Sequence, residues 1–151
     1  MADGTRSEAL AEAVRGVLET MFFTGAESER PGYASGTAGA IEARLRFDGE
    51  RPGEFRVLVA PGAARSIAAN FLGADEEAEI TEAQAGDVVS ELANMICGSA
   101  LSRLEGDVAF DLSHPSVSRL DAEPAAWPDG AARTFDLENG WLTAAIRFEA
   151  P

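Results

Sequence analysis

The sequence has few of the residues that usually build a disulfide scaffold, a zinc site or a membrane anchor. One cysteine, Cys97, and no CxxC pair exclude a disulfide framework within the chain. One histidine, His114, has no clustered Cys or His partners and is expected at a turn or a strand end rather than at a metal. No stretch approaches the ~20 apolar residues that a membrane-spanning helix needs. Residues 1–13 lack the basic and apolar regions of a signal peptide, so a reducing cytosol is the expected compartment.

Positive charge is also scarce. The chain has 12 basic and 26 acidic residues and a formal net charge of -14 at pH 7. Such a charge repels phosphate backbones and anionic lipid headgroups, which makes nucleic acid and membrane surfaces poor partners and leaves protein surfaces as the expected ones. A length of 151 residues with 46% hydrophobic content is typical of one globular domain, expected over residues 1–151.

The N-terminal segment has apolar residues at helical spacing. The apolar residues recur at a spacing that predicts a helix with one buried stripe: Leu10, Val14, Val17, Leu18, Met21 and Phe22. Thr5 and Glu8 have the spacing of a capping box at the helix start, and Gly25 is a plausible stop. Residues 25–36 are polar and glycine-rich, which predicts a loop.

In the middle and at the end of the chain, apolar and polar residues alternate with a period of two. This pattern predicts strands at 41–47 and 55–60, at Val108, Phe110 and Leu112, and at 133–138 and 141–148. Pro115 should end the third of these, and Asn139-Gly140 suits a type I′ turn between the last two. A helix should start near Pro61 and stop before Gly73. Residues 75–79 are expected to be a solvated connection and residues 121–130 a loop. Trp127 and Trp141 are expected in the core. The predicted fold is α/β, with a mixed or mainly antiparallel sheet of about five strands against three main helices.

The longest predicted helix follows Thr81 and Gln84, another capping-box pair, and continues to about Leu104. At about 100° per residue, one narrow strip of this helix holds nearly all its polar positions. These are Asp87, Glu91, Asn94, Gly98, Ser102 and Glu105, shared only with Leu101. Nearly all the other positions between residues 87 and 105 are apolar, Arg103 is the charged exception, and Cys97 lies among the apolar positions as a small buried residue. The helix should therefore be buried in the core with one exposed strip.

That strip is open to two interpretations. For Asp87, Ser102 and Glu105 a plain solvent-facing role suffices. Asn94 and Gly98 suggest a contact surface, because Asn is a mediocre helix former and a mid-helix Gly costs about 1 kcal/mol relative to Ala. A carboxylate can pair with a cation, and the amide three residues on can orient a water molecule but cannot act as a base.

The spacing Asp87-x3-Glu91-x2-Asn94 resembles the active helix of the CheX/CheC/FliY family of chemotaxis phosphatases. In that family a proline follows some twenty residues later, and Pro115 matches it by type. The leading helix and the strand pair with the helix after it also resemble the family, which implies a CheC-like domain. A single Glu-x2-Asn helix is closer to CheX than to the two-site CheC type.

The resemblance implies hydrolysis of the aspartyl phosphate on a CheY-like receiver domain. Asn94 is then expected to hold the attacking water, and Glu91 to pair with the receiver's lysine. The surrounding contact surface would include Asp87, Gly98, Ser102 and Pro115. The protein would need no cofactor of its own, since the magnesium ion belongs to the receiver, and a homodimer is expected.

Two other functions fit the same sequence. One is a non-catalytic signalling or motor-switch module that uses the same helix surface. The other is a small-molecule sensor with a pocket under the loop at residues 25–36.

Overall fold

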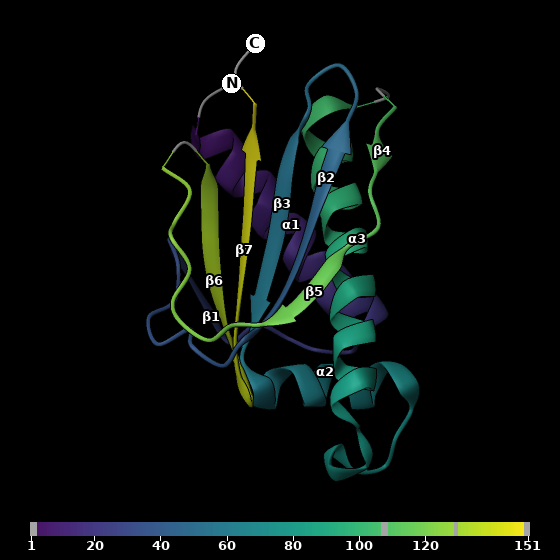
Figure 1. The fold of residues 1–151 in the computed structure, drawn as a ribbon. Coiled ribbons are helices and arrows are strands. Elements are labelled where there is room, and N and C mark those ends of the chain that lie inside the picture. Colours follow the sequence, from purple (N-terminus) through teal and green to yellow (C-terminus); the bar gives the residue numbers. More distant parts are fainter. Residues whose placement is uncertain (1–2, 107–108, 129, 150–151) are drawn as a thin grey trace.

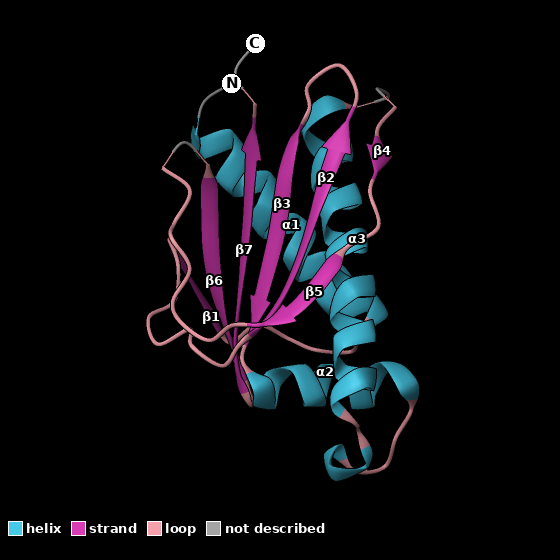
Figure 2. Cartoon of the chain, in the orientation of Figure 1, coloured by secondary structure: helices cyan, strands magenta, loops and turns pink. Residues whose placement is uncertain are grey.

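The computed structural model describes residues 3–106, 109–128 and 130–149. Three α-helices and one short 3-10 helix accompany a seven-stranded sheet (Figures 1 and 2). In chain order the elements are α1 (Asp3–Met21), β1 (Ser28–Pro31), β2 (Ile41–Asp48), β3 (Gly53–Val59), α2 (Pro61–Leu72), η1 (Glu77–Glu79), α3 (Glu82–Glu105), β4 (Asp111–Leu112), β5 (Ser116–Arg119), β6 (Ala131–Leu137) and β7 (Gly140–Phe148). The predicted α/β class with three main helices is confirmed.

The sheet has the order β1-β6-β7-β3-β2-β4, and β5 also pairs with β2. Every pairing between the described strands is antiparallel. β4 and β5 share β2 as a neighbour, because β5 pairs with its first half and β4 with its last two residues. The sheet therefore has two more strands than the five expected from the sequence.

The unexpected strands lie at the edges of the sheet. β1 falls inside residues 25–36, which were predicted to be a loop, and β5 begins directly after Pro115. All side chains of both strands are exposed, so neither has the apolar alternation that marks a half-buried strand. Of the strand predicted at Val108, Phe110 and Leu112, Val108 lies outside the described residues, and pairing is confined to Asp111–Leu112.

The ends of α1 differ from prediction. The helix already includes Asp3, so Thr5 and Glu8 lie inside it, and the capping box predicted there is wrong. It ends at Met21, four residues before Gly25, because Phe23 adopts a left-handed φ of 52° that a helix cannot continue through. The ends of α2 agree with prediction: Pro61 occupies the first turn and Gly73, with φ 71°, caps the C-terminus.

The β6–β7 hairpin is confirmed, but its turn is not the one predicted. Leu137 pairs with Gly140, so the two turn residues are Glu138 and Asn139. A type I′ turn needs positive φ at both, and neither has it. Gly140 instead allows a close approach to the start of α2, since a Cβ on it would lie 3.0 Å from the Cβ of Ala60.

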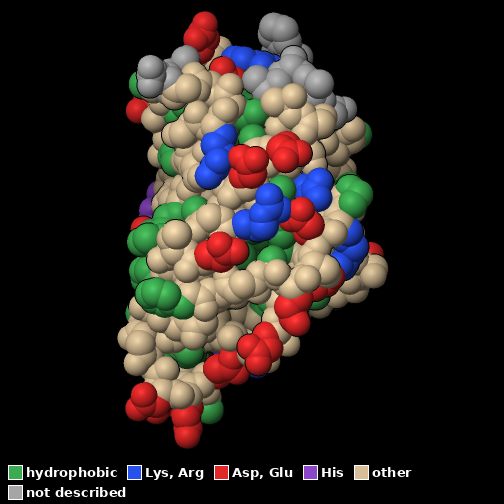
Figure 3. Space-filling view, turned by 180° about the vertical axis from the view of Figure 1, so that it is seen from behind, with side chains coloured by type: hydrophobic (Ala, Val, Ile, Leu, Met, Phe, Trp, Pro, Cys, Tyr) green, Lys and Arg blue, Asp and Glu red, His purple; other side chains and the backbone are tan. Residues whose placement is uncertain are grey.

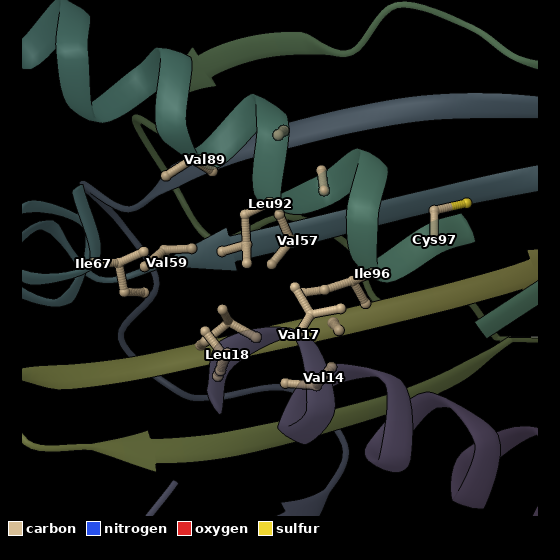
Figure 4. Close-up of a cluster of buried hydrophobic side chains, with 14 of the residues drawn as sticks. Val14, Val17, Leu18, Val57, Val59, Ile67, Val89, Leu92, Ile96 and Cys97 are labelled. Carbon is tan, nitrogen blue, oxygen red and sulfur yellow. The ribbon is translucent and has the colours of Figure 1, made fainter. Parts of the chain in front are cut away.

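The core lies between the sheet and the helices. Figure 4 shows α1, α2 and α3 directing apolar side chains toward β3 and its neighbours. The labelled residues are Val14, Val17, Leu18, Val57, Val59, Ile67, Val89, Leu92, Ile96 and Cys97. None of the described helices is long and apolar enough to cross a membrane.

The other face of the sheet is covered in part by the segment before β6. Trp127, 9% exposed, lies under the guanidinium groups of Arg44, Arg56 and Arg147, at 5.5, 4.4 and 4.7 Å from its ring centroid. Arg56, 3% exposed, donates hydrogen bonds to the Tyr33 hydroxyl (2.6 Å) and to the Ala125 carbonyl (2.6 Å). The buried position expected for Trp127 is confirmed, and these contacts fix the covering segment to the sheet.

Candidate functional site

The N-terminus of α3 is fixed by the predicted capping box. The Thr81 hydroxyl accepts a hydrogen bond from the Gln84 backbone N–H (3.1 Å), and the Gln84 side chain accepts one from the Thr81 N–H (2.9 Å). Two amide groups that a helix start leaves without partners are thereby satisfied. The 24-residue helix then runs without interruption to Glu105.

Most of α3 is buried, as its sequence predicts. Nine side chains are buried between α1, α2 and the sheet, namely Ala85, Val88, Val89, Leu92, Ala93, Ile96, Cys97, Ala100 and Leu101. Leu101 was expected to share the exposed strip, but it is only 1% exposed because it lies at the strip's edge and turns into the core. Arg103, the polar exception, donates to Glu12 of α1 at 2.9 Å.

The predicted strip lies on the remaining side of α3. Asp87, Glu91 and Ser102 are exposed, and Asn94 and Gly98 are half-buried. Glu105, the last residue of the strip, lies 3.9 Å from Arg51 and its side chain is only 15% exposed. The solvent-accessible part of the strip therefore extends from Asp87 to Ser102.

Glu91 and Asn94 are free to contact another molecule. They lie three residues apart on one helix face, where side chains are neighbours. Within the described part of the chain, neither side chain makes a hydrogen bond or an ion pair. A Cβ placed on Gly98, one turn beyond Asn94, would meet no other atom within 4 Å. The carboxylate, the amide and the open space beside them form a contact surface that this chain does not occupy itself.

Arginine–carboxylate ion pairs lie elsewhere on the molecule. Figure 3 shows the helix side, where arginine and acidic side chains lie next to one another in the middle and acidic ones gather at the lower end, near α2 and η1 in Figure 1. Ion pairs join Arg15 to Glu29 (2.5 Å) and Arg103 to Glu12 (2.9 Å). Among the described residues, no arginine pairs with Asp87 or Glu91 in this way.

Pro115 lies in the connection between β4 and β5, which runs beside α3 in Figure 1. Its side chain is buried, and β5 contacts α3. The structure thus places the predicted proline directly before a strand that packs against α3, buried rather than on the exposed surface.

The other reactive side chains are not at this site. Burial raises the pKa of the Cys97 thiol to about 12, so it is not a thiolate at neutral pH. His114 is exposed between β4 and β5. The described residues contain no group of three or more His, Cys, Asp or Glu side chains that could hold a metal ion.

The loop pocket considered from the sequence is small. A hollow of about 80 Å³ borders residues 25–36, but Gly25 is its one lining residue from that segment. The rest of its lining comes from residues 23–24, from α2 and from the β6–β7 turn. Small-molecule sites usually have volumes of about 300–1,000 Å³. This hollow gives the sensor interpretation little support.

A family model described as chemotaxis phosphatase CheX matches residues 41–135, which is more than half of the chain and includes β2 to β5 and all of α3. No curated protein matches the chain.

Three similar solved structures cover the same fold. Chemotaxis protein CheX from Vibrio vulnificus is 21% identical with a TM-score of 0.77, over 99% of this chain and 99% of that one. CheX from Desulfovibrio desulfuricans is 23% identical with a TM-score of 0.76, over 95% of this chain and 99% of that one. A CheX-CheY-BeF3-Mg2+ complex from Borrelia burgdorferi contains a chain that is 17% identical with a TM-score of 0.73, over 95% of this chain and 97% of that one.

Proposed function

Because this chain belongs to the CheX family of chemotaxis phosphatases, we propose that it hydrolyses the aspartyl phosphate of a CheY-like response-regulator receiver domain. Asn94 orients the attacking water, and Glu91 pairs with a lysine of the receiver. The observation that carries these roles is the unpartnered carboxylate and amide, side by side on the exposed strip of a helix that is otherwise buried. The Borrelia burgdorferi complex of a CheX with CheY, BeF3 and Mg2+ supports a receiver domain as the partner.

The chemistry needs little from the protein beyond position. The water oxygen attacks phosphorus, the bond from phosphorus to the aspartyl oxygen breaks, and the products are the free carboxylate and inorganic phosphate, which keeps the water's protons. Phosphoryl transfer depends mainly on alignment and charge stabilisation. The Asn94 carbonyl can accept a hydrogen bond from the water and hold it in line, although the amide cannot remove a proton.

Most other residues of the proposed contact surface lie on the same strip of α3. Asp87 and Ser102 border the catalytic pair and contact the receiver, while Gly98 lets its backbone or side chains approach the helix closely. Pro115 keeps β5 in place next to α3. We expect the magnesium ion to come with the receiver, which the Mg2+ in the Borrelia burgdorferi CheX-CheY-BeF3 complex supports, and this chain to supply no ligand.

The roles of Asn94 and Glu91 are tested separately. With a phosphorylated receiver in excess, Asn94→Ala should reduce phosphate release at least about 100-fold, since loss of alignment alone has an effect of this size. Binding should persist. Asn70→Ala on α2, an exposed helical asparagine outside the strip, is the control and should remain active. If Asn94→Ala is fully active, the water-orienting role is wrong. Binding by the unmodified protein without any phosphate release would indicate the non-catalytic module instead.

The pairing of Glu91 can be detected by cross-linking. All 12 basic residues of this chain are arginine, so no lysine side chain within it can couple to Glu91. A carbodiimide, which joins carboxylates to amines, should therefore link Glu91 to a lysine of the receiver, and mass spectrometry can locate the link. Glu91→Gln should remove this link and weaken docking, whereas Glu19→Gln on α1 should change neither. If the receiver is cross-linked to other carboxylates but not to Glu91, the proposed ion pair is wrong.

We further propose that residues 1–151 act as one CheX-like domain in the cytoplasm and form a homodimer. The exposed edge strands favour self-association, because among the described strands β1 pairs on one side only, with β6. Light scattering at several protein concentrations tests this, and a monomer at every concentration would contradict it.

A further inference from the structure

A groove beside the exposed strip has no role in the proposed reaction. It lies between the first two turns of α3 and strand β5, with a volume of about 420 Å³. Four apolar or small residues contribute to its lining, namely Ile41, Ala83, Gly86 and Val117, and Glu82, Asp87, Ser118 and Arg119 complete it. Glu82 and Arg119 form an ion pair with each other, which leaves Asp87 as the one unpaired charge of the lining.

Val117 is the apolar group that this groove presents to solvent. Its side chain is 41% exposed. The described large hydrophobic residues with comparable exposure are Met21, Phe23, Phe71 and Leu72, all at the ends of α1 and α2. Gly86 keeps the groove open opposite Val117, since a Cβ there would lie 3.5 Å from the valine Cγ1.

The groove is continuous with the strip. Asp87 belongs to both, and at 1.5 Å per residue it lies about 10 Å along the helix axis from Asn94. A typical protein interface covers about 800 Å² per partner, a patch roughly 30 Å across. A domain that places its phosphoryl group at Asn94 therefore also covers the groove.

We propose that the groove is a second anchor point for the receiver domain and takes an uncharged aliphatic or aromatic side chain from it. This inference rests on the proposed function. The lining favours such a side chain, because its floor is apolar, its ion pair is internal, and its free carboxylate is shared with the strip. The groove adds affinity and selects among receivers, while Asn94 and Glu91 act at the phosphoryl group about 10 Å away.

Two substitutions remove the anchor in opposite ways. Val117→Ser takes away the apolar contact, and Gly86→Leu fills the groove while improving helix propensity. Each should raise the Kd for a beryllofluoride-activated receiver by about tenfold. KM should rise by a similar factor, while kcat should stay unchanged. Leu72→Ser, which changes an exposed apolar residue at the end of α2, is the matched control and should leave the Kd unchanged. Circular dichroism verifies that each variant is folded.

Binding and hydrolysis are measured on the same panel of purified receivers, so the two proposals can fail separately. If Val117→Ser and Gly86→Leu both bind with the unmodified Kd, the anchor is refuted whether or not phosphate is released. If they bind weakly but the unmodified protein releases no phosphate, the anchor stands and the phosphatase proposal fails. If no receiver binds at all, both proposals are overturned.

Discussion

Replacing Gly98 with alanine should make the protein more stable and less able to engage its partner. Gly98 lies in the middle of α3, and a mid-helix Gly-to-Ala change is worth about 1 kcal/mol when the new methyl group fits. Here it fits, since a Cβ on Gly98 meets no atom within 4 Å beyond its chain neighbours and the adjacent helix backbone. For a chain of this length, 1 kcal/mol corresponds to a rise in Tm of about 2–4 °C.

The functional effect should depend on the size of the new side chain. If a receiver approaches the helix at Gly98, a methyl group causes a mild clash and Gly98→Leu a severe one. Overpacking a fitted contact costs about 1–3 kcal/mol, which corresponds to roughly 5- to 150-fold in affinity. Gly98→Leu should therefore retain its fold and lose most of its binding.

Urea unfolding followed by circular dichroism gives the free energy of unfolding, and fluorescence anisotropy with a labelled receiver gives the Kd. Gly16→Ala in α1 is the matched control, because a Cβ there lies 3.8 Å from the flexible Arg103 guanidinium, an ordinary contact. It should gain a similar free energy of unfolding and keep the unmodified Kd. Unchanged affinity in Gly98→Leu would refute the idea that a partner lies against this turn, and destabilisation by Gly98→Ala would refute the open space described around it.

Three further predictions concern the rest of the molecule. Trp127→Ala should lower the free energy of unfolding by about 3–5 kcal/mol in urea titrations, because a buried tryptophan and its arginine contacts are lost; a loss below about 1 kcal/mol would show that the covering segment contributes little. Burial alone raises the pKa of Glu54, but hydrogen bonds from Arg147 and Arg44 outweigh it and lower that pKa below 4.5. A lowered folded-state pKa means that stability is fully present above about pH 5 and is lost as the pH falls through the folded pKa, so Glu54→Gln should flatten the acid limb of a plot of unfolding free energy against pH. Cys97, whose pKa burial raises to about 12, should resist a thiol reagent at pH 8 in the native protein and react at once in 8 M urea; rapid native labelling would contradict its burial.

The central helix could be predicted closely from the sequence because its pattern is long and strongly periodic. The apolar positions of α3 and its exposed strip repeat at helical spacing, and the structure confirms them except at Leu101 and Glu105. It also confirms the capping box at Thr81. The inner strands β2 and β3 and the β6–β7 pair were also predicted, since they are rich in buried apolar residues. Burial alternates along β2, whereas β3 and β7 each bury five consecutive residues.

The misses have physical reasons as well. β1 and β5 are held by backbone pairing at the sheet edges and bury no side chains, so their sequences carry no apolar period. Asn139-Gly140 suggested a type I′ turn, but Gly140 is required by its contact with α2 rather than by the turn. The arrangement of three guanidinium groups around Trp127 depends on residues from β2, β3, β7 and a distant connection, and no local pattern brings those together.

The packing of α3 in the core limits how the contact surface can adapt to a new partner. Nine of the helix's side chains are interlocked with the other helices and the sheet, so the helix cannot rotate or slide without disturbing the hydrophobic interior. The angle at which Glu91 and Asn94 meet an incoming domain is thus fixed before any encounter. Adaptation to a new receiver has to come from substitutions at exposed positions around Glu91 and Asn94, such as Asp87, Ser102 or Val117. Such substitutions should change the free energy of unfolding very little.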